Sequence, residues 1–214
     1  MNLKSIVTLF TIYIIAGSLL AAGGDNMKNV PLKAEDVKPL NVGQKIPAAT
    51  LKTYDGKPFD LNKAIAEKPS VLIFYRGGWC PYCNVHLGKI KEIEDKLLAM
   101  GYQIFAVSTD KPSKVNATKE KHNAKYILLS DHKMTFSMDF GLAFKVPGQL
   151  VKKYKTAYKI DLEADSGETH HLLPVPSVFL VGTDGKIKFS YVNPDYKIRI
   201  EPAKLLAEAK KYAK

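Results

Sequence analysis

Two cysteines, Cys80 and Cys83, are the residues of this 214-residue chain whose type and spacing most clearly predict chemistry. They are the only cysteines in the chain, and both lie in the stretch RGGWCPYC. The apolar run at 71–75, directly before this stretch, predicts a buried strand, and the pattern after it predicts a helix. Two thiols three residues apart, where a strand ends and a helix begins, are typical of redox sites.

The start of a helix favours a thiolate, because its free N–H groups and partial positive charge stabilise an anion. We expect Cys80 at this end, Pro81 at the first helical position and Cys83 about one turn further on, within disulfide reach. Arg76 should lower the pKa of Cys80 further. Since the dipole effect fades after the first turn, Cys80 is expected to have the lower pKa and to react first.

Other uses of the two cysteines fit less well. A structural disulfide at this spacing closes a loop too small to stabilise the fold much. A zinc site that adds His86 is disfavoured, because the three side chains do not share a helix face and there is no second cysteine pair. Haem attachment requires a histidine directly after the second cysteine, where the chain has Asn84. The sequence therefore predicts neither a metal nor a cofactor.

The charge of the chain does not indicate a nucleic-acid partner. The formal net charge is +11, but of the 32 basic residues only Arg76 and Arg199 are arginines. Base recognition favours arginine, and the sequence has no basic block interleaved with aromatic residues. We therefore expect the lysines to form a solvated basic surface.

The first 22 residues have the pattern of a secretory signal peptide. Lys4 supplies a positive charge, residues 6–20 are apolar and uncharged, and small residues follow at 21–24. The sequence thus predicts cleavage before about residue 25 and a periplasmic or secreted protein, a setting that favours oxidised thiols. The alternative is an uncleaved membrane anchor, since the apolar run is near the shortest length that spans a bilayer.

The remainder of the chain predicts one α/β domain. Residues 23–40 lack periodicity and are interpreted as a linker or extended lead-in, and 41–214 as the domain. Strand–helix–strand–helix units come first and an antiparallel hairpin closes the sheet, so we expect helices around a central mixed sheet, with ligands at the carboxyl ends of the parallel strands. The expected elements are a hairpin at 51–61, strands at 71–75, 103–107, 126–129, 178–181 and 187–192, and helices at 82–100, 113–123, 132–140, 148–158 and 203–213; 161–169 is expected to be a loop.

From about residue 42 to 213 the sequence resembles thioredoxin-fold proteins of the peroxiredoxin and alkyl hydroperoxide reductase type. The stretch from Phe74 to Cys83 is similar to the FYRGGWCPYC form of a peroxiredoxin-like subgroup. Three further stretches support the resemblance: 53–57 before the active-site strand, 129–131 followed by 140–142, and Val175-Pro176 before 177–180.

The resemblance implies a thioredoxin-like sandwich with an N-terminal hairpin, and an antioxidant enzyme that reduces hydroperoxides. Cys80 would attack the peroxide and become a sulfenic acid, Cys83 would condense with it to a disulfide, and a thioredoxin-like partner would reduce the pair. Trp79 would pack beside the motif. Pro176 would follow a cis peptide bond and face the cysteines.

Two residues differ from the pattern of this family when they are counted from Cys80. The family has a Thr three residues before the reacting cysteine and a Pro four residues before that, and here these positions hold Gly77 and Ile73. The family also places a distant arginine beside the cysteine. Arg76 is expected to be close, whereas Arg199 lies after the last predicted hairpin.

Two other functions remain open from the sequence. The dithiol could exchange with protein disulfides of the cell envelope, with Cys80 attacking and Cys83 resolving. A thioredoxin-like fold with paired thiols could instead carry Cu(I) without being an enzyme. Tyr82 and His86 are expected on the helix surface, and His170 and His171 in a loop.

Overall fold

The computed structural model describes residues 29–123 and 125–213. The predicted signal peptide and the first part of the predicted linker lie outside these residues. No helix in the described part of the chain is both long and apolar enough to cross a bilayer.

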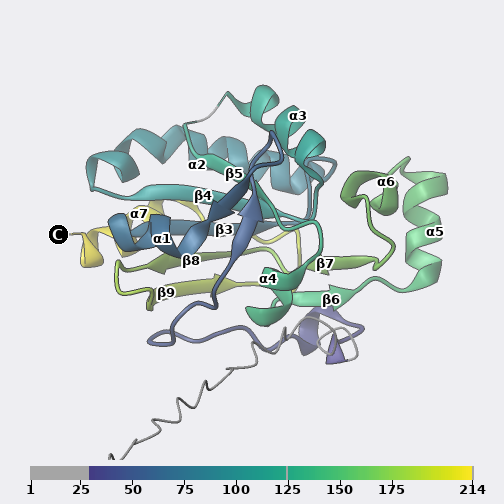
Figure 1. The fold of residues 1–214 in the computed structure, drawn as a ribbon, viewed down its shortest axis with the longest axis horizontal. Coiled ribbons are helices and arrows are strands. Elements are labelled where there is room, and N and C mark those ends of the chain that lie inside the picture. Colours follow the sequence, from purple (N-terminus) through teal and green to yellow (C-terminus); the bar gives the residue numbers. More distant parts are fainter. Residues whose placement is uncertain (1–28, 124, 214) are drawn as a thin grey trace, which may run out of the picture.

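A seven-stranded mixed sheet forms the centre of the molecule (Figure 1). Its strand order is β2-β1-β5-β4-β3-β8-β9, and β6 and β7 form a separate two-stranded sheet. Strands β3, β4 and β5 are parallel, whereas β8 and β9 form the antiparallel hairpin that was predicted. The strands are β1 (Thr50–Lys52), β2 (Pro58–Asp60), β3 (Ser70–Tyr75), β4 (Gln103–Ser108), β5 (Ile127–Ser130), β6 (Ala143–Lys145), β7 (Leu172–Pro174), β8 (Ser177–Val181) and β9 (Ile187–Val192).

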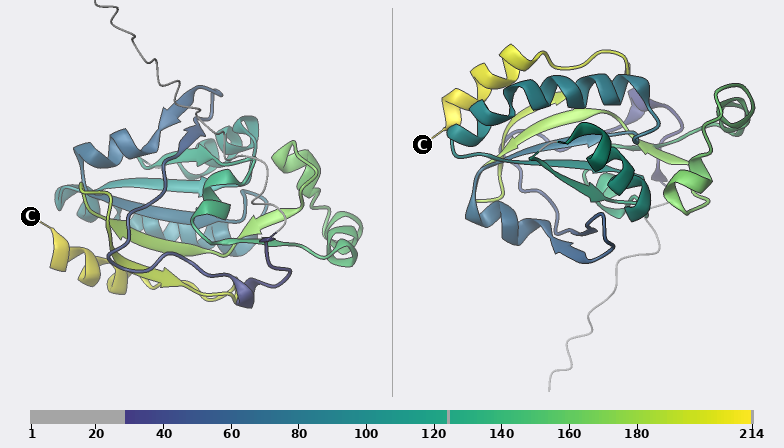
Figure 2. Two further views of the ribbon diagram at one scale, coloured as in Figure 1. Left: turned by 60° about the horizontal axis from the view of Figure 1, so that its bottom comes forward. Right: turned by 90° about the horizontal axis from the view of Figure 1, so that it is seen from above.

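Helices cover both faces of this sheet (Figure 2). Side chains alternate between the faces along each strand, so β3 contributes Ile73 and Tyr75 to one core and Leu72 and Phe74 to the other. The first core includes side chains of α2, α3 and α7, and the second those of α1 and α4. The helices are α1 (Leu61–Glu67), α2 (Pro81–Ala99), α3 (Pro112–His122), α4 (Thr135–Asp139), α5 (Gly148–Ala157), α6 (Leu162–Ser166) and α7 (Pro202–Tyr212), with a short 3-10 helix at Ala34–Asp36.

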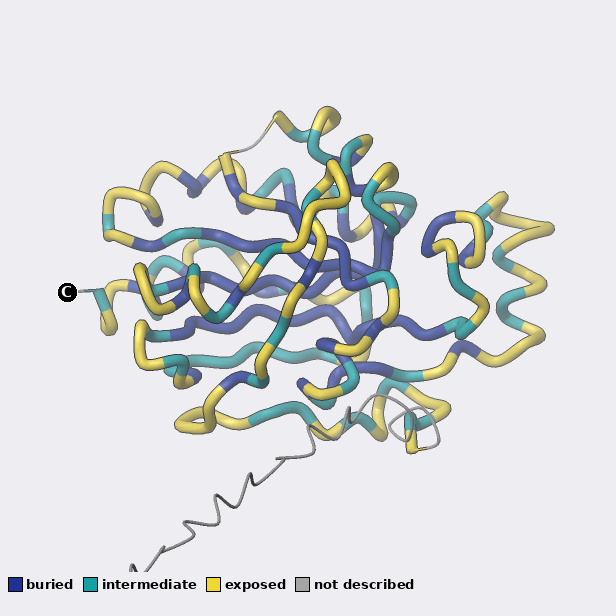
Figure 3. Tube along the Cα trace, in the orientation of Figure 1, coloured by how far each residue is buried: buried dark blue, intermediate teal, exposed yellow. Residues whose placement is uncertain are grey.

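The central strands are buried along their whole length (Figure 3). All six residues of β3 are buried, because β4 and β8 pair with its two edges and helices cover both of its faces. A strand in this position holds the residues that follow it rigidly. The predicted thioredoxin-like α/β sandwich, with its hairpin of β1 and β2, is confirmed.

Three short elements were not predicted. The strands β6 and β7 have only three residues each, which is too few for a periodic pattern. The expected loop at 161–169 contains α6, a five-residue helix that begins where the Asp161 side chain accepts the Ala164 N–H, at 3.1 Å, and ends at Gly167.

The helices α5 and α6 form an arm that stands off the main sheet between β6 and β7 (Figures 1 and 2). No residue of α5 is buried. The arm has a small core of its own around Val146, Leu162 and Leu173, and the ring of Trp79 packs against it. The arm is therefore joined to the loop that carries the two cysteines.

The described part of the predicted linker, residues 29–40, lies against the second core. Leu40 donates its N–H to the Phe140 carbonyl at 3.2 Å. Gly141 has φ +73°, and a Cβ there would lie 2.0 Å from the Lys38 carbonyl oxygen. A side chain at position 141 would thus displace this segment.

Candidate active site

The two cysteines lie at the start of α2, directly beyond the carboxyl end of β3. Cys80 is the N-cap residue, Pro81 is the first helical residue, and Cys83 lies in the first turn, as the sequence predicted. Both thiols are reduced, and Cys80 is 1% and Cys83 0% exposed. A reactant must therefore be small or be admitted by a movement of the surrounding residues.

Two glycines allow the loop before Cys80 to turn tightly. Gly77 has φ +152°, and a Cβ there would lie 2.3 Å from Trp79 Nε1. A Cβ on Gly78 would lie 2.0 Å from Thr118 Oγ1 of α3. Cys80 donates its N–H to the Gly77 carbonyl at 3.1 Å, which closes the turn. A side chain at position 77 or 78 would clash with Trp79 or Thr118 and displace the loop.

Arg199 is the charged group that contacts a sulfur. It donates a hydrogen bond from Nη2 to Cys83 Sγ at 3.4 Å, while its Nε donates to the Tyr196 carbonyl at 2.8 Å. Burial alone would raise the pKa of Cys83. The hydrogen bond from the Cys80 thiol and the charge of Arg199 outweigh burial and lower this pKa to about 6.

The expectation that Cys80 has the lower pKa is wrong. Its hydrogen bond to Cys83 and its burial raise the pKa of Cys80 above the usual value, and Arg76 opposes this only in part. The backbone N–H of Cys83, in the first turn of the helix, lowers the pKa of Cys80 only in part. The Arg199 contact therefore favours the thiolate on Cys83.

Arg76 lies in an aromatic cage and not on a sulfur. It is 4% exposed, and it donates a hydrogen bond from Nη2 to the Tyr154 hydroxyl of α5. Its guanidinium carbon lies 4.4 Å from the ring centre of Tyr196, 5.1 Å from that of Trp79 and 5.6 Å from that of Tyr154. Arg76 and Trp79 thus connect the cysteine loop to the arm.

The expected cis bond before Pro176 is not present. The described residues contain no cis peptide bond, so Val175–Pro176 is trans. The chain passes directly from β7 to β8 at this point, and a trans bond keeps it extended. Pro176 is buried, and it precedes Ser177, which pairs with Phe74 of β3. Pro176 therefore lies near the carboxyl end of β3, where the cysteine loop begins.

His86 is buried and not on the helix surface as predicted. It is 3% exposed, and burial together with the charges of Arg199 and Lys89 lowers its pKa to about 3. Within the described residues, neither ring nitrogen has a hydrogen-bond partner. His86 and Arg199 line a groove of about 300 Å³, together with Val85 and the exposed Tyr82. Arg199 thus both lines this groove and contacts the buried Cys83 sulfur.

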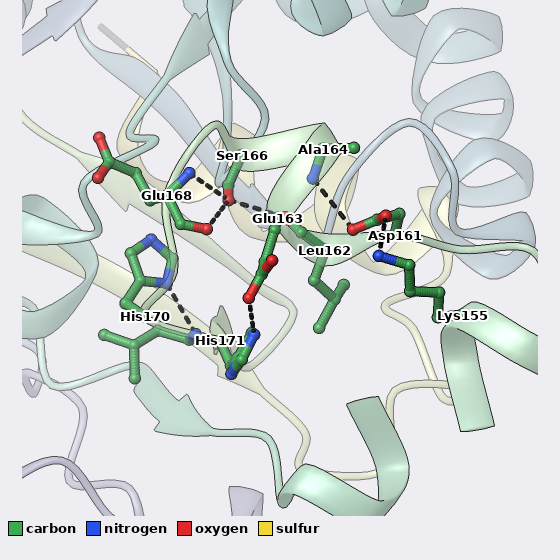
Figure 4. A network of polar contacts seen from close by, with 10 residues as sticks. Lys155, Asp161, Leu162, Glu163, Ala164, Ser166, Glu168, His170 and His171 are labelled. Atoms are coloured by element: carbon green, nitrogen blue, oxygen red, sulfur yellow. Dashed lines mark hydrogen bonds and ion pairs between the residues drawn. The ribbon is translucent and has the colours of Figure 1, made fainter. Parts of the chain in front are cut away.

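His170 and His171 lie in the loop before β7, as predicted, and their contacts are with neighbouring segments (Figure 4). His170 accepts the Leu172 N–H on Nδ1 at 2.8 Å, so its Nε2 donates to the His132 carbonyl. His171 contacts Glu163 of α6 at 2.8 Å. The contact of His171 therefore joins this loop to α6.

Four residues of this site were not identified from the sequence: Arg199, Tyr196, Tyr154 and Asp110. Asp110 follows β4, lies beneath the cysteine loop and accepts the Gly78 N–H. Arg199 had one available signal, because it is one of only two arginines in a lysine-rich chain. No group of three or more His, Cys, Asp and Glu side chains in the described ranges is arranged to hold a metal.

The comparisons with known proteins agree with this geometry. Residues 42–190 match the model of the AhpC/TSA family. Peroxiredoxin Q of Suaeda salsa is 32% identical over 118 residues, which are 55% of each protein, and peroxiredoxin Bcp of Escherichia coli is 27% identical over 161 residues, which are 75% of this chain and 90% of Bcp. The chain spans about half the length of the plant relatives it matches.

Solved structures show the same fold. Reduced Prx3 of Vibrio vulnificus in complex with H₂O₂ superposes with a TM-score of 0.65 at 21% identity, over 79% of this chain and 99% of Prx3. Peroxidoxin BcpB of Mycobacterium tuberculosis gives 0.62 at 20% identity, over 82% and 99%. With the family model covering most of the described residues, this chain belongs to the AhpC/TSA family, the peroxiredoxin-like proteins of the thioredoxin fold.

Proposed function

We propose that this protein is a thiol peroxidase in which Cys83 attacks the hydroperoxide and Cys80 resolves the product. The observation that carries the assignment is the Arg199 contact with Cys83 Sγ, which supplies positive charge to the sulfur in a buried site. Family membership supports peroxide as the substrate. The order of the two cysteines is thus the reverse of the order expected from the sequence.

The family pattern can also be counted from Cys83. Counted from Cys83, the position three residues before the reacting cysteine holds Cys80, and the position four residues before that holds Arg76. Cys80 therefore occupies the place of the family's Thr. A thiol at this position donates a hydrogen bond to the reacting sulfur, as a threonine hydroxyl could. Unlike a hydroxyl, the thiol can also form a disulfide.

The reaction then has three steps. The Cys83 thiolate attacks the terminal oxygen of the hydroperoxide, the O–O bond breaks, and the leaving oxygen takes a proton to become an alcohol or water. The Cys80 sulfur displaces the hydroxyl of the Cys83 sulfenic acid, loses its proton and releases water. A thioredoxin-like dithiol then reduces the Cys80–Cys83 disulfide by exchange.

Burial and charge in the reduced state favour this function over the two alternatives. As the oxidising substrate, a folded protein disulfide would reach the thiols only after the surrounding residues move, because both cysteines are 1% exposed or less, whereas a hydroperoxide is small. Cu(I) carriage requires a site that favours a cation, and the Arg199 guanidinium beside Cys83 opposes this. Both observations favour a small, uncharged oxidant.

One experiment tests the three functions together. The reduced protein without residues 1–22 is mixed in parallel with hydrogen peroxide, an organic hydroperoxide and a disulfide-bonded protein, and thiol loss is followed in time. We expect fast loss with a hydroperoxide and slow loss with the protein disulfide. The reverse order would reject the proposal in favour of disulfide exchange, and copper that stays bound through gel filtration would favour the carrier.

Export is a second part of the proposal, supported by the sequence of residues 1–22 alone. We propose that this segment directs the chain to the periplasm or the exterior and is removed. Intact-mass measurement of protein from the native cell envelope should show a chain that begins before about residue 25. A mass that includes Met1 would support an uncleaved anchor.

A further inference from the structure

Asp110 is a buried carboxylate at the active site for which the proposed reaction has no role. It follows the end of β4, the strand that pairs with β3, and it is 1% exposed. Oδ2 accepts the Gly78 N–H at 2.7 Å, and a Cβ on Gly77 would lie 2.7 Å from Oδ1. The carboxylate therefore lies directly beneath the loop that leads to the two cysteines.

A second buried aspartate, Asp131, shows what a structural carboxylate looks like in this fold. It follows β5, the next strand in the sheet, and it is 5% exposed. Oδ1 accepts the Phe136 N–H at 3.2 Å, and Oδ2 accepts the Ser137 N–H at 2.8 Å and hydroxyl at 2.7 Å. Both oxygens of Asp131 are thus used at the start of α4.

Asp110, in contrast, has one oxygen free within the described part of the chain. Its Oδ1 is buried and has no hydrogen-bond partner there. Leaving a buried acceptor without a partner costs about 1–3 kcal/mol, and more if the group is charged. A proton on this carboxyl would remove the charge, so the site favours the acid form.

The charges around Asp110 connect it to the redox pair. Burial raises the pKa of Asp110 to about 7, the Gly78 N–H and the Ser108 hydroxyl oppose this, and the charges of Asp165 and Cys83 raise it further. Tyr75 of β3 and Lys114 of α3 also face it, and Lys114 is paired with Asp165 at 2.9 Å. Of these groups, Cys83 is the one whose charge changes when the disulfide forms.

We propose that Asp110 is a positioning residue that takes up one proton each time the Cys80–Cys83 disulfide is reduced and releases it when the disulfide forms again. This inference rests on the proposed dithiol–disulfide cycle. Reduction adds two electrons and two protons: the S–S bond breaks, one proton goes to the Cys80 sulfur, Cys83 becomes a thiolate, and the second proton goes to Asp110. The buried negative charge then stays at one, because the thiolate replaces the carboxylate.

In both redox states Asp110 thus accepts the Gly78 N–H. On reduction the negative charge is lost from Asp110 and appears on the Cys83 sulfur. If the carboxylate stayed ionised next to the Cys83 thiolate, two like charges would be buried together, which is unfavourable. Near neutral pH the reduction equilibrium should therefore depend on pH more steeply than a thiol and a thiolate alone require. The extra proton changes the equilibrium constant of reduction by up to a further tenfold per pH unit.

Infrared difference spectra of the reduced and oxidised protein test where the proton goes. At neutral pH we expect a protonated-carboxyl C=O band on reduction, which is absent in Asp110→Asn and retained in the matched control Asp131→Asn. The amide of Asp110→Asn can still accept the Gly78 N–H through its oxygen, so this variant removes the proton site and keeps the contact. A band that persists in Asp110→Asn would overturn the proposal.

The redox equilibrium supplies a second measurement. Titration against a dithiol reagent at several pH values should give a steeper pH dependence for the unaltered protein than for Asp110→Asn, and equal slopes would contradict the proposal. If Asp110→Asn does not fold, carboxyl-carbon NMR of the unaltered protein in both redox states decides: the pKa of Asp110 must be higher in the reduced state. These measurements use no hydroperoxide, so a failed peroxidase assay is a separate outcome.

Discussion

The two cysteines have opposite surroundings, although both lie in the first turn of one helix. Cys83 has an arginine on its sulfur and a pKa lowered to about 6, whereas Cys80 donates a hydrogen bond and has a raised pKa. The two arginines of the chain differ in the same way. Arg199 contacts a sulfur, and Arg76, although nearer in sequence, is enclosed by aromatic rings.

This difference teaches that a helix N-terminus does not by itself decide which thiol ionises. Cys80 has the better position along the helix, but the backbone N–H of Cys83 and the charge of Arg76 lower its pKa less than burial and its hydrogen bond to the Cys83 sulfur raise it. A guanidinium in direct contact within a buried site acts at short range and low dielectric, where charge interactions are strongest. In the proposed mechanism the reactive residue is therefore determined by a tertiary contact.

The largest expected effect comes from exchanging the two cysteines for serine separately. Cys83→Ser should abolish peroxide consumption, because the thiolate is lost. Cys80→Ser should keep one fast turnover and then stop with a sulfenic acid on Cys83, because the resolving thiol is lost. Single-turnover kinetics with mass spectrometry measures both. If Cys80→Ser loses the first turnover and Cys83→Ser keeps it, the assignment must be reversed.

The next effect concerns the two arginines, which form a matched pair. Arg199→Met should slow the first turnover about 10²-fold, the usual cost of losing one donor that stabilises a developing charge. It should also raise the pKa of Cys83, so that the fall in rate expected below about pH 6 in the unaltered protein begins at a higher pH. Alkylation rates across pH, read by mass spectrometry, give this pKa.

Arg76→Met is the control for that experiment. Since Arg76 contacts rings and the Tyr154 hydroxyl, its removal should leave the pKa of Cys83 near its original value. Arg199→Lys should react faster than Arg199→Met but slower than the unaltered protein, because lysine restores the charge but not the planar guanidinium. A larger loss of rate in Arg76→Met than in Arg199→Met would contradict the comparison.

The smallest effect is expected where the arm meets the loop. Tyr154→Phe removes the hydroxyl that accepts the Arg76 hydrogen bond and keeps the ring, so it should lower the free energy of unfolding by about 1–2 kcal/mol. The rate of peroxide attack should change less than about threefold. Chemical denaturation measures the first quantity and stopped-flow kinetics the second. A rate loss near that of Arg199→Met would give the arm a direct part in the reaction.

Local signals in the sequence were enough to predict the fold and the location of the dithiol. The apolar run of β3, the two glycines and the proline after Cys80 each act over a few residues, and the structure has the strand, the turn and the helix where they predict them. The hairpins at Asp55-Gly56 and Asp184-Gly185 were predictable for the same reason. The short elements β6, β7 and α6 carry no such pattern and were missed.

The chemistry of the site depends on contacts that sequence distance hides. Arg199 lies 116 residues from Cys83, and Tyr154 lies 78 residues from Arg76. His86 has helical spacing with Ile90 and lies on the buried face of α2, although its residue type suggested the surface. Such contacts follow only from the order of strands in the sheet, which one sequence does not specify.

The long separation between Cys83 and Arg199 also determines when the thiol becomes acidic. A ribosome synthesises the chain from the N-terminus to the C-terminus. Both cysteines therefore emerge well before Arg199, which lies between β9 and α7. Until β8 and β9 join the sheet, the arginine has no fixed place beside the sulfur. A nascent or truncated chain therefore carries two ordinary cysteines, and the reactivity of Cys83 reports that synthesis and folding are complete.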